Sequence, residues 1–223
     1  MASGSGTLVY VANFGADSSF AGNKTAQGNQ DENAKGEFYY APPTGFLALC
    51  TDNLSDPSIA LPGENVNTVL YTGNSGVSQA ISGVGFQPDF VWIKGRNVAH
   101  SHFLATSVGG VDNSLRSSET GAYETYDGLD SFDSDGFTLG TWTRVNAGSD
   151  TYASWNWKGG GAVNPSVNAT AGFSIATGTG TGGQVATNHG LGVTPELIIW
   201  KATTGVSHWF VWWNGFTLSL IHI

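Results

Sequence analysis

The chain has 223 residues, of which 11% are charged and 12% are aromatic, with 32 glycines and a formal net charge of −9. Disordered chains carry few aromatics and many charges, so this composition indicates a folded protein built from short strands and tight turns. Only 8 residues are Lys or Arg, which argues against a nucleic-acid partner because phosphate binding needs clustered positive charge. The one cysteine cannot form an internal disulfide, so the fold must depend on packing.

The two ends carry no membrane or secretion signal. The first six residues lack the basic start and apolar stretch of a signal peptide, and no segment is long enough to span a bilayer.

The last six residues, 218–223, resemble the translation of a common sequencing adaptor. We therefore expect the biological sequence to stop near Thr217.

The first part of the chain contains a long polar excursion over residues 15–36, without any periodicity. Order returns at residues 37–40, and a turn follows at 42–45. A loose stretch rich in Pro, Ser and Gly then predicts a domain boundary near residue 64. Residues 1–64 are thus expected to form one domain.

The second part of the chain contains an internal repeat. Residues 83–94 return as residues 190–201 with the same glycine, proline, acidic and lysine positions. The offset is constant, since Pro88 and Pro195 differ by 195 − 88 = 107 positions. A fixed offset predicts a duplicated structural unit, with a first β-repeat over 65–160 and a truncated second repeat over 161–217.

Several segments of the repeat have the composition of strands. Residues 90–94 are apolar on both faces and predict a central strand, whereas residues 152–158 alternate as in a half-buried strand. The strand tryptophans Trp92, Trp155 and Trp200 are expected in the core. The prediction is an all-β fold of antiparallel sandwich or jelly-roll-like units, internally repeated. Because the second copy is expected to be truncated, its strand at 197–201 is expected to lack partner strands that the equivalent strand at 90–94 has.

Two long motifs resemble tailed-phage structural proteins. Asn13-Phe14-Gly15, followed by F-Y-Y-A-P-P-T-G-F-L-A-L-C-T-D-N-L over 38–54, resembles the closing part of a SPRY or concanavalin A-like domain. Residues 65–217 resemble a glycine-rich β-domain of marine phage tail and virion proteins, through I-S-G-V-G-F-Q-P-D-F-V-W-I-K-G-R over 81–96. The chain departs from this pattern in its polar excursion and in lacking the front of the SPRY-like domain.

Two groups of residues are candidates for ligand binding. Asp130, Asp133 and Asp135 could place carboxylate oxygens around a calcium ion, although Asp-Gly before a strand also favours a hairpin turn, which we consider the better interpretation. No other cofactor is indicated. Eight tryptophans in a weakly charged chain suggest aromatic stacking on sugars, and Trp142, Trp212 and Trp213 are the candidates because they lie near loops or the chain end.

The resemblance implies a phage structural protein of the tail fibre or virion surface, without catalytic activity. The expected partners are a host cell-surface glycan or protein and other virion proteins, with no nucleic acid and no membrane. A homotrimer is expected by analogy with fibre proteins, although no heptad seam supports it. The expected location is the virion or the cell exterior, after assembly in the host bacterial cytoplasm. The alternatives are a carbohydrate-binding module of a secreted bacterial protein, and the non-catalytic part of a phage depolymerase.

Overall fold

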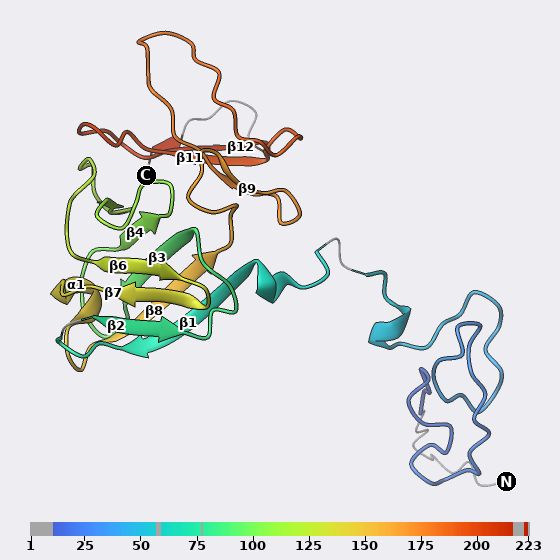
Figure 1. Ribbon diagram of the computed structural model, residues 1–223. Helices are drawn as coiled ribbons and strands as arrows, with labels where there is room; N and C mark the ends of the chain where they lie inside the picture. Colours follow the sequence, from blue (N-terminus) through green and yellow to red (C-terminus); the bar gives the residue numbers. More distant parts are fainter. Residues whose placement is uncertain (1–10, 57–58, 77, 216–220, 223) are drawn as a thin grey trace, which may run out of the picture. The chain divides into compact units, whose positions relative to one another are not determined.

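The computed structural model describes residues 11–56, 59–76, 78–215 and 221–222, which belong to two compact units (Figure 1). The first unit is Met1–Ala60 and the second is Leu61–Ile223. The division after residue 60 lies close to the boundary predicted near residue 64.

The first unit consists mainly of turns. Its described residues form one 3-10 turn, η1 (Thr51–Asn53), and one isolated β-bridge between Asn29 and Phe38. The resemblance to the end of a SPRY-like domain implies strands here, but the closing strands of a sandwich would have no sheet to join within this unit.

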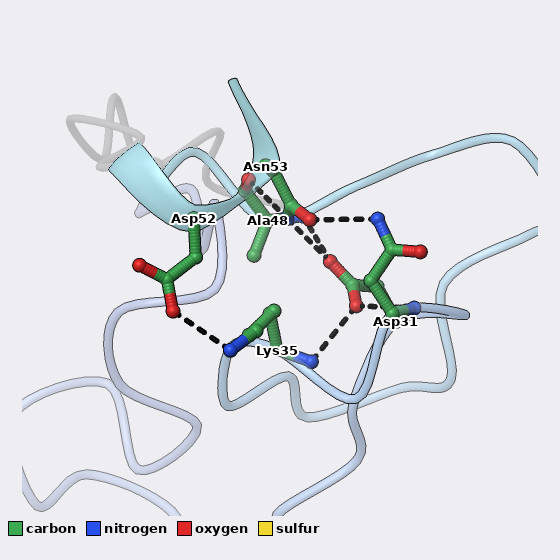
Figure 2. Close-up of polar contacts among 6 residues, drawn as sticks. Asp31, Lys35, Ala48, Asp52 and Asn53 are labelled. Carbon is green, nitrogen blue, oxygen red and sulfur yellow. Dashed lines mark hydrogen bonds and ion pairs between the residues drawn. The ribbon is translucent and has the colours of Figure 1, made fainter. Parts of the chain in front are cut away.

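A buried carboxylate, Asp31, organises these turns (Figure 2). It accepts hydrogen bonds from the backbone N–H of Ala48 at 2.7 Å, of Lys35 at 2.9 Å and of Asn33 at 2.9 Å. The side-chain amide of Asn53 also donates to it at 2.7 Å. Burial by itself raises the pKa of this carboxyl, but the donated hydrogen bonds outweigh it and the net pKa lies below the ordinary value. One charged group therefore connects segments that are far apart in sequence.

The described residues of the second unit form four antiparallel sheets and two short helical turns, and the two sheets described first enclose the core. The larger sheet has the order β1 (Val66–Thr72), β8 (Thr151–Trp157), β3 (Phe90–Gly95), β4 (Phe103–Thr106) and β5 (Ser114–Leu115). The smaller sheet has the order β2 (Gln79–Ser82), β7 (Gly136–Leu139) and β6 (Leu129–Asp133). The helical turns are η2 (Pro62–Glu64) and α1 (Thr143–Asn146). In Figure 1 the strands of the smaller sheet cross in front of the larger one.

The core lies between these two sheets. Val91 and Ile93 of β3 are 0% and 1% exposed, and they belong to one buried cluster with Phe137 of β7, Leu129 of β6 and Val145 of α1. Strands alternate their side chains between two faces, so one face of each sheet supplies this cluster. The predicted all-β antiparallel sandwich is therefore confirmed.

The turn between β6 and β7 has the predicted hairpin form. Asp133 pairs with Gly136, which leaves Ser134 and Asp135 as a two-residue loop. Gly136 has a φ of 151°, and a Cβ at this position would lie 1.9 Å from the carbonyl oxygen of Ile81. Only glycine permits β2 to approach this closely.

The remaining strands form two small sheets. The first pairs β9 (Ser166–Asn168) with β10 (Phe173–Ile175), and the second has the order β11 (Leu197–Trp200), β12 (Phe210–Trp213) and β13 (Ile221–His222). Of the predicted adaptor-derived tail, residues 218–220 and 223 lie outside the described residues, and 221–222 form β13.

The two hairpins β3–β4 and β11–β12 have the same register at the offset of the repeat. Phe90 pairs with Thr106 in the first hairpin. Leu197 pairs with Trp213 in the second, and 90 + 107 = 197 while 106 + 107 = 213. The two hairpins therefore share one register, and the duplication of a whole structural unit stays a prediction.

Candidate functional site

The outer face of the larger sheet carries a group of aromatic side chains. We call Phe90, Trp92, Trp155 and Trp157 the aromatic row. In the β3–β8 ladder Phe90 pairs with Trp157 and Trp92 with Trp155. The ring centroids of the first pair are 5.0 Å apart and those of the second pair 6.1 Å apart. Trp155 is 36% exposed, so the row reaches solvent.

The expectation that Trp92, Trp155 and Trp200 fill the core is wrong. The core side of β8 carries Tyr152, Ser154 and Asn156, each 0% exposed, and the tryptophans lie on the opposite side. Trp200 is 43% exposed.

Hydrogen bonds explain why polar residues of β8 can occupy the core. The side-chain amide of Asn156 donates to the backbone oxygen of Asn67 at 3.1 Å. The hydroxyl of Ser154 donates to the backbone oxygen of Val69 at 3.4 Å. Buried polar groups are tolerated where they find such partners. Alternation alone therefore identified the two faces of β8 but not which one was buried.

Apolar residues of β1 extend the aromatic row. Val66 pairs with Trp157 and Leu70 with Ala153, so both lie on the same face as the row. They are 41% and 59% exposed. At the same end, Phe173 of β10 stacks on Trp157 with ring centroids 6.4 Å apart. The row and its β1 neighbours thus form a partly exposed apolar surface over three strands.

A histidine borders the other side of the row. The indole Nε1 of Trp92 donates a hydrogen bond of 2.7 Å to Nδ1 of His102. This bond requires an unprotonated Nδ1. Burial, and secondarily the positive charge of Lys94, lowers the pKa of His102. The histidine therefore fixes the orientation of the Trp92 ring as a neutral acceptor.

Other side chains pack against the ring of Trp142, a predicted stacking residue. Its ring lies parallel to that of Tyr126 at an interplanar angle of 3°, with centroids 4.4 Å apart. The guanidinium carbons of Arg116 and Arg144 lie 5.7 Å and 5.9 Å from its centroid, and the ring of Phe103 lies 5.8 Å away. Because Tyr126 covers one face of the indole, Trp142 is a packing residue more than an open platform.

Arg116 connects this aromatic pair to an acidic loop. Its guanidinium pairs with Glu119 at 2.7 Å and with Glu124 at 2.5 Å, and only 11% of its side chain is exposed. Its backbone oxygen accepts a hydrogen bond of 3.0 Å from the indole of Trp209. The arginine is thus neutralised and held in place by its neighbours.

Trp212 and Trp213, the other predicted stacking residues, lie on β12. Successive residues of a strand point to opposite faces, so the structure does not bring these two rings onto one surface. Trp213 is 48% exposed, and Trp212 is half-buried. Neither belongs to the aromatic row.

The three aspartates considered for calcium each have separate partners. Asp130 accepts from Ser78 at 2.8 Å, Asp133 accepts from Ser131 and Thr138, each at 2.7 Å, and Asp135 accepts the backbone N–H groups of the loop after β2. Those N–H groups lower the pKa of Asp135. In the part of the chain that the structure describes, no three His, Cys, Asp or Glu side chains are grouped to hold a metal ion.

Comparison with known proteins places the second unit in a family. A family model described as a domain of unknown function, DUF7483, matches residues 61–221. The chain belongs to this family. The match begins where the second unit begins and spans both hairpins of the repeat. No curated protein and no solved structure matches the chain.

The sequence contains a signal for the aromatic row. The patterns Phe90-x-Trp92 and Trp155-x-Trp157 each place two aromatics on one strand face, and the two strands are neighbours in the sheet. The hydrogen bond between Trp92 and His102 and the stacking of Tyr126 on Trp142 depend on loop geometry, for which the sequence contains no such signal.

Among the described helices, none is long and apolar enough to cross a membrane.

Proposed function

We propose that this protein is a non-catalytic phage structural protein of the tail fibre or virion surface, and that it adheres to host-surface glycans through the aromatic row. The observation that carries the binding role is the pair of cross-strand aromatic contacts on the outer face of the larger sheet, where Trp155 and Leu70 are partly exposed. The virion role is supported by the resemblance of residues 38–54 and 81–96 to phage proteins.

The chemistry of the row suits a sugar ligand. A pyranose ring has faces made of C–H bonds, which pack on the faces of indole and phenyl rings. The row is held by backbone pairing and by the hydrogen bond from Trp92 to His102, so little side-chain freedom is lost on binding. Sites on strands are also more precisely positioned than sites on loops.

The charge of the chain indicates which glycans are suitable. A formal net charge of −9 disfavours approach of a polyanionic polysaccharide. The basic side chain next to Trp92 on this face of β3, Lys94, donates hydrogen bonds to the backbone oxygens of Gly95 and Val98. Neutral glycans are therefore the proposed ligand class.

A glycan array with the intact chain tests this proposal. Saturable binding to neutral glycans that is lost in Trp155→Ala supports adhesion through the row. Cleavage of a glycan, or binding that survives Trp155→Ala, would contradict it.

A further inference from the structure

The aromatic row is bordered by an exposed strip of strand β1. Val66 and Thr68 pair with Trp157 and Trp155, and Leu70 follows two residues later, so these three β1 side chains share the face of the row. All three are exposed, and we call them the β1 strip. Strand residues rise by about 3.3 Å each, so the strip from Val66 to Leu70 is about 13 Å long. The exposed part of the face is therefore elongated along the strands.

The opposite side of the row is covered. In the β3–β4 ladder Trp92 pairs with Leu104, which lies on the same face but is only 7% exposed. The ring of Trp92 is itself half-buried and is hydrogen-bonded to His102. The accessible part of the face thus lies over β1 and β8 and ends at β3.

An elongated face suits an extended chain better than a single sugar. Sites for single small molecules are usually concave and enclose most of the ligand. The aromatic row lies instead on the outer face of a sheet, with the centroids of Phe90 and Trp92 6.4 Å apart along one strand. One sugar ring covers little more than one indole, whereas a chain contacts successive rings and loses its translational freedom only once.

Thr68 supplies a hydrogen-bonding group at the centre of the β1 strip. Directly opposed residues of an antiparallel pair have Cβ atoms about 5 Å apart, so the side chain of Thr68 lies next to that of Trp155. A sugar that stacks on an indole carries its hydroxyl groups around its rim, where a neighbouring threonine can reach them. A few polar groups beside an apolar surface are what fixes the orientation of a ligand.

We propose that this face binds an extended, neutral polysaccharide of the cellulose type along several successive sugar units, with the hydroxyl of Thr68 bonded to the unit that stacks on Trp155. A cellulose-type chain is a straight ribbon, whereas an amylose-type chain curves and follows a straight strip over a shorter length. A neutral ligand agrees with the formal net charge of −9. This inference rests on the proposed glycan binding by the aromatic row, and it adds the shape of the ligand and a contact outside the row.

Calorimetric titration of the intact chain with glucose oligomers tests the inference. The probes are cellobiose, cellotetraose and cellohexaose, with maltohexaose as the curved control. We expect at least about tenfold tighter binding of cellohexaose than of cellobiose, because the longer chain contacts more of the row and the strip. Maltohexaose is expected to bind at least about tenfold more weakly than cellohexaose.

Two variants of β1 test the contact with Thr68. Thr68→Val removes the hydroxyl and keeps the β-branched shape, and we expect about fivefold weaker binding of cellohexaose. Thr72→Val makes the same change at an exposed position of β1 beyond the strip, and we expect an affinity within about twofold of the native chain. Valine is well tolerated in strands, so both variants should unfold near the native temperature.

Four results would overturn the inference. They are no binding of the cellulose-type oligomers, equal affinity for cellobiose and cellohexaose, equal affinity for cellohexaose and maltohexaose, and an unchanged affinity of Thr68→Val. If the glycan array still shows binding that is lost in Trp155→Ala, such a result rejects the inference and leaves the proposed function standing. Array binding that survives Trp155→Ala rejects the proposed function itself.

Discussion

The hydroxyl of Ser107 donates a hydrogen bond of 2.6 Å to a carboxylate oxygen of Asp89, and both side chains are buried. The other oxygen of Asp89 accepts the backbone N–H of Gly159 at 2.7 Å. Ser107 follows β4 and Gly159 lies just beyond β8, so one carboxylate connects the ends of three neighbouring strands.

Replacement of Asp89 should therefore destabilise the larger sheet. Asp89→Ala leaves two donors without their acceptor, and we expect the free energy of unfolding to fall by about 3 kcal/mol. The matched control is Glu196→Ala, at the equivalent and exposed position of the second copy, with an expected change below about 0.5 kcal/mol. Urea denaturation followed by tryptophan fluorescence measures both. Equal losses in the two variants would refute this role of Asp89.

Asp31 should give the first unit a pH dependence. Its folded pKa lies below the ordinary value of 3.8, so its contribution to stability is present above that value and is lost as the pH falls through the folded pKa. The amide resonance of Ala48 should titrate with Asp31, because this N–H donates to the carboxylate.

Two variants assign this titration. Asp31→Asn should abolish the acid titration of the Ala48 amide. Asp52→Asn removes only the exposed ion pair with Lys35 and should leave the titration unchanged. If the titration persisted in Asp31→Asn, another group would be responsible.

His102 should make the Trp92 contact sensitive to mild acid. Its folded pKa is below the ordinary value of 6.5, so the unfolded chain binds more protons between the two values. Stability from this contact is therefore fully present above 6.5 and is lost as the pH falls through the folded pKa. His102→Asn keeps an acceptor near the position of Nδ1 and should remove this dependence. The chemical shift of the Trp92 indole N–H measures the state of this hydrogen bond directly. A chemical shift that does not change with pH in the native chain would contradict the assignment.

The sandwich could be predicted from sequence because its strands carry strong local signals. The run at β3 and the Asp-Gly turn before β7 define their elements without tertiary information. The burial of β8 could not be predicted in this way, since its core face is the polar one. Ser154 and Asn156 are buried because backbone oxygens of β1 accept their hydrogen bonds, and that pairing spans more than 80 residues. The stacking of Trp142 on Tyr126 likewise depends on how two loops meet.

Trp142 and Trp155 should differ in their contributions to stability. Trp142 packs against the core through Phe103 and Tyr126, so Trp142→Ala should lower the free energy of unfolding by about 3 kcal/mol. Trp155 lies on the outer face and is partly exposed, so Trp155→Ala should cost about 1 kcal/mol. Thermal or urea unfolding measures both. A larger loss for Trp155 would place that residue in the core after all.

The affinity of Trp155→Ala for a neutral glycan tests the central claim most directly, with Trp213→Ala as the matched control. Both tryptophans are partly exposed, but only Trp155 belongs to the aromatic row. Calorimetric titration with a glycan identified on the array should give at least about tenfold weaker binding for Trp155→Ala and an affinity near that of the native chain for Trp213→Ala. The reverse result, with binding lost in Trp213→Ala and kept in Trp155→Ala, would contradict the assignment of the site to the outer face of the larger sheet.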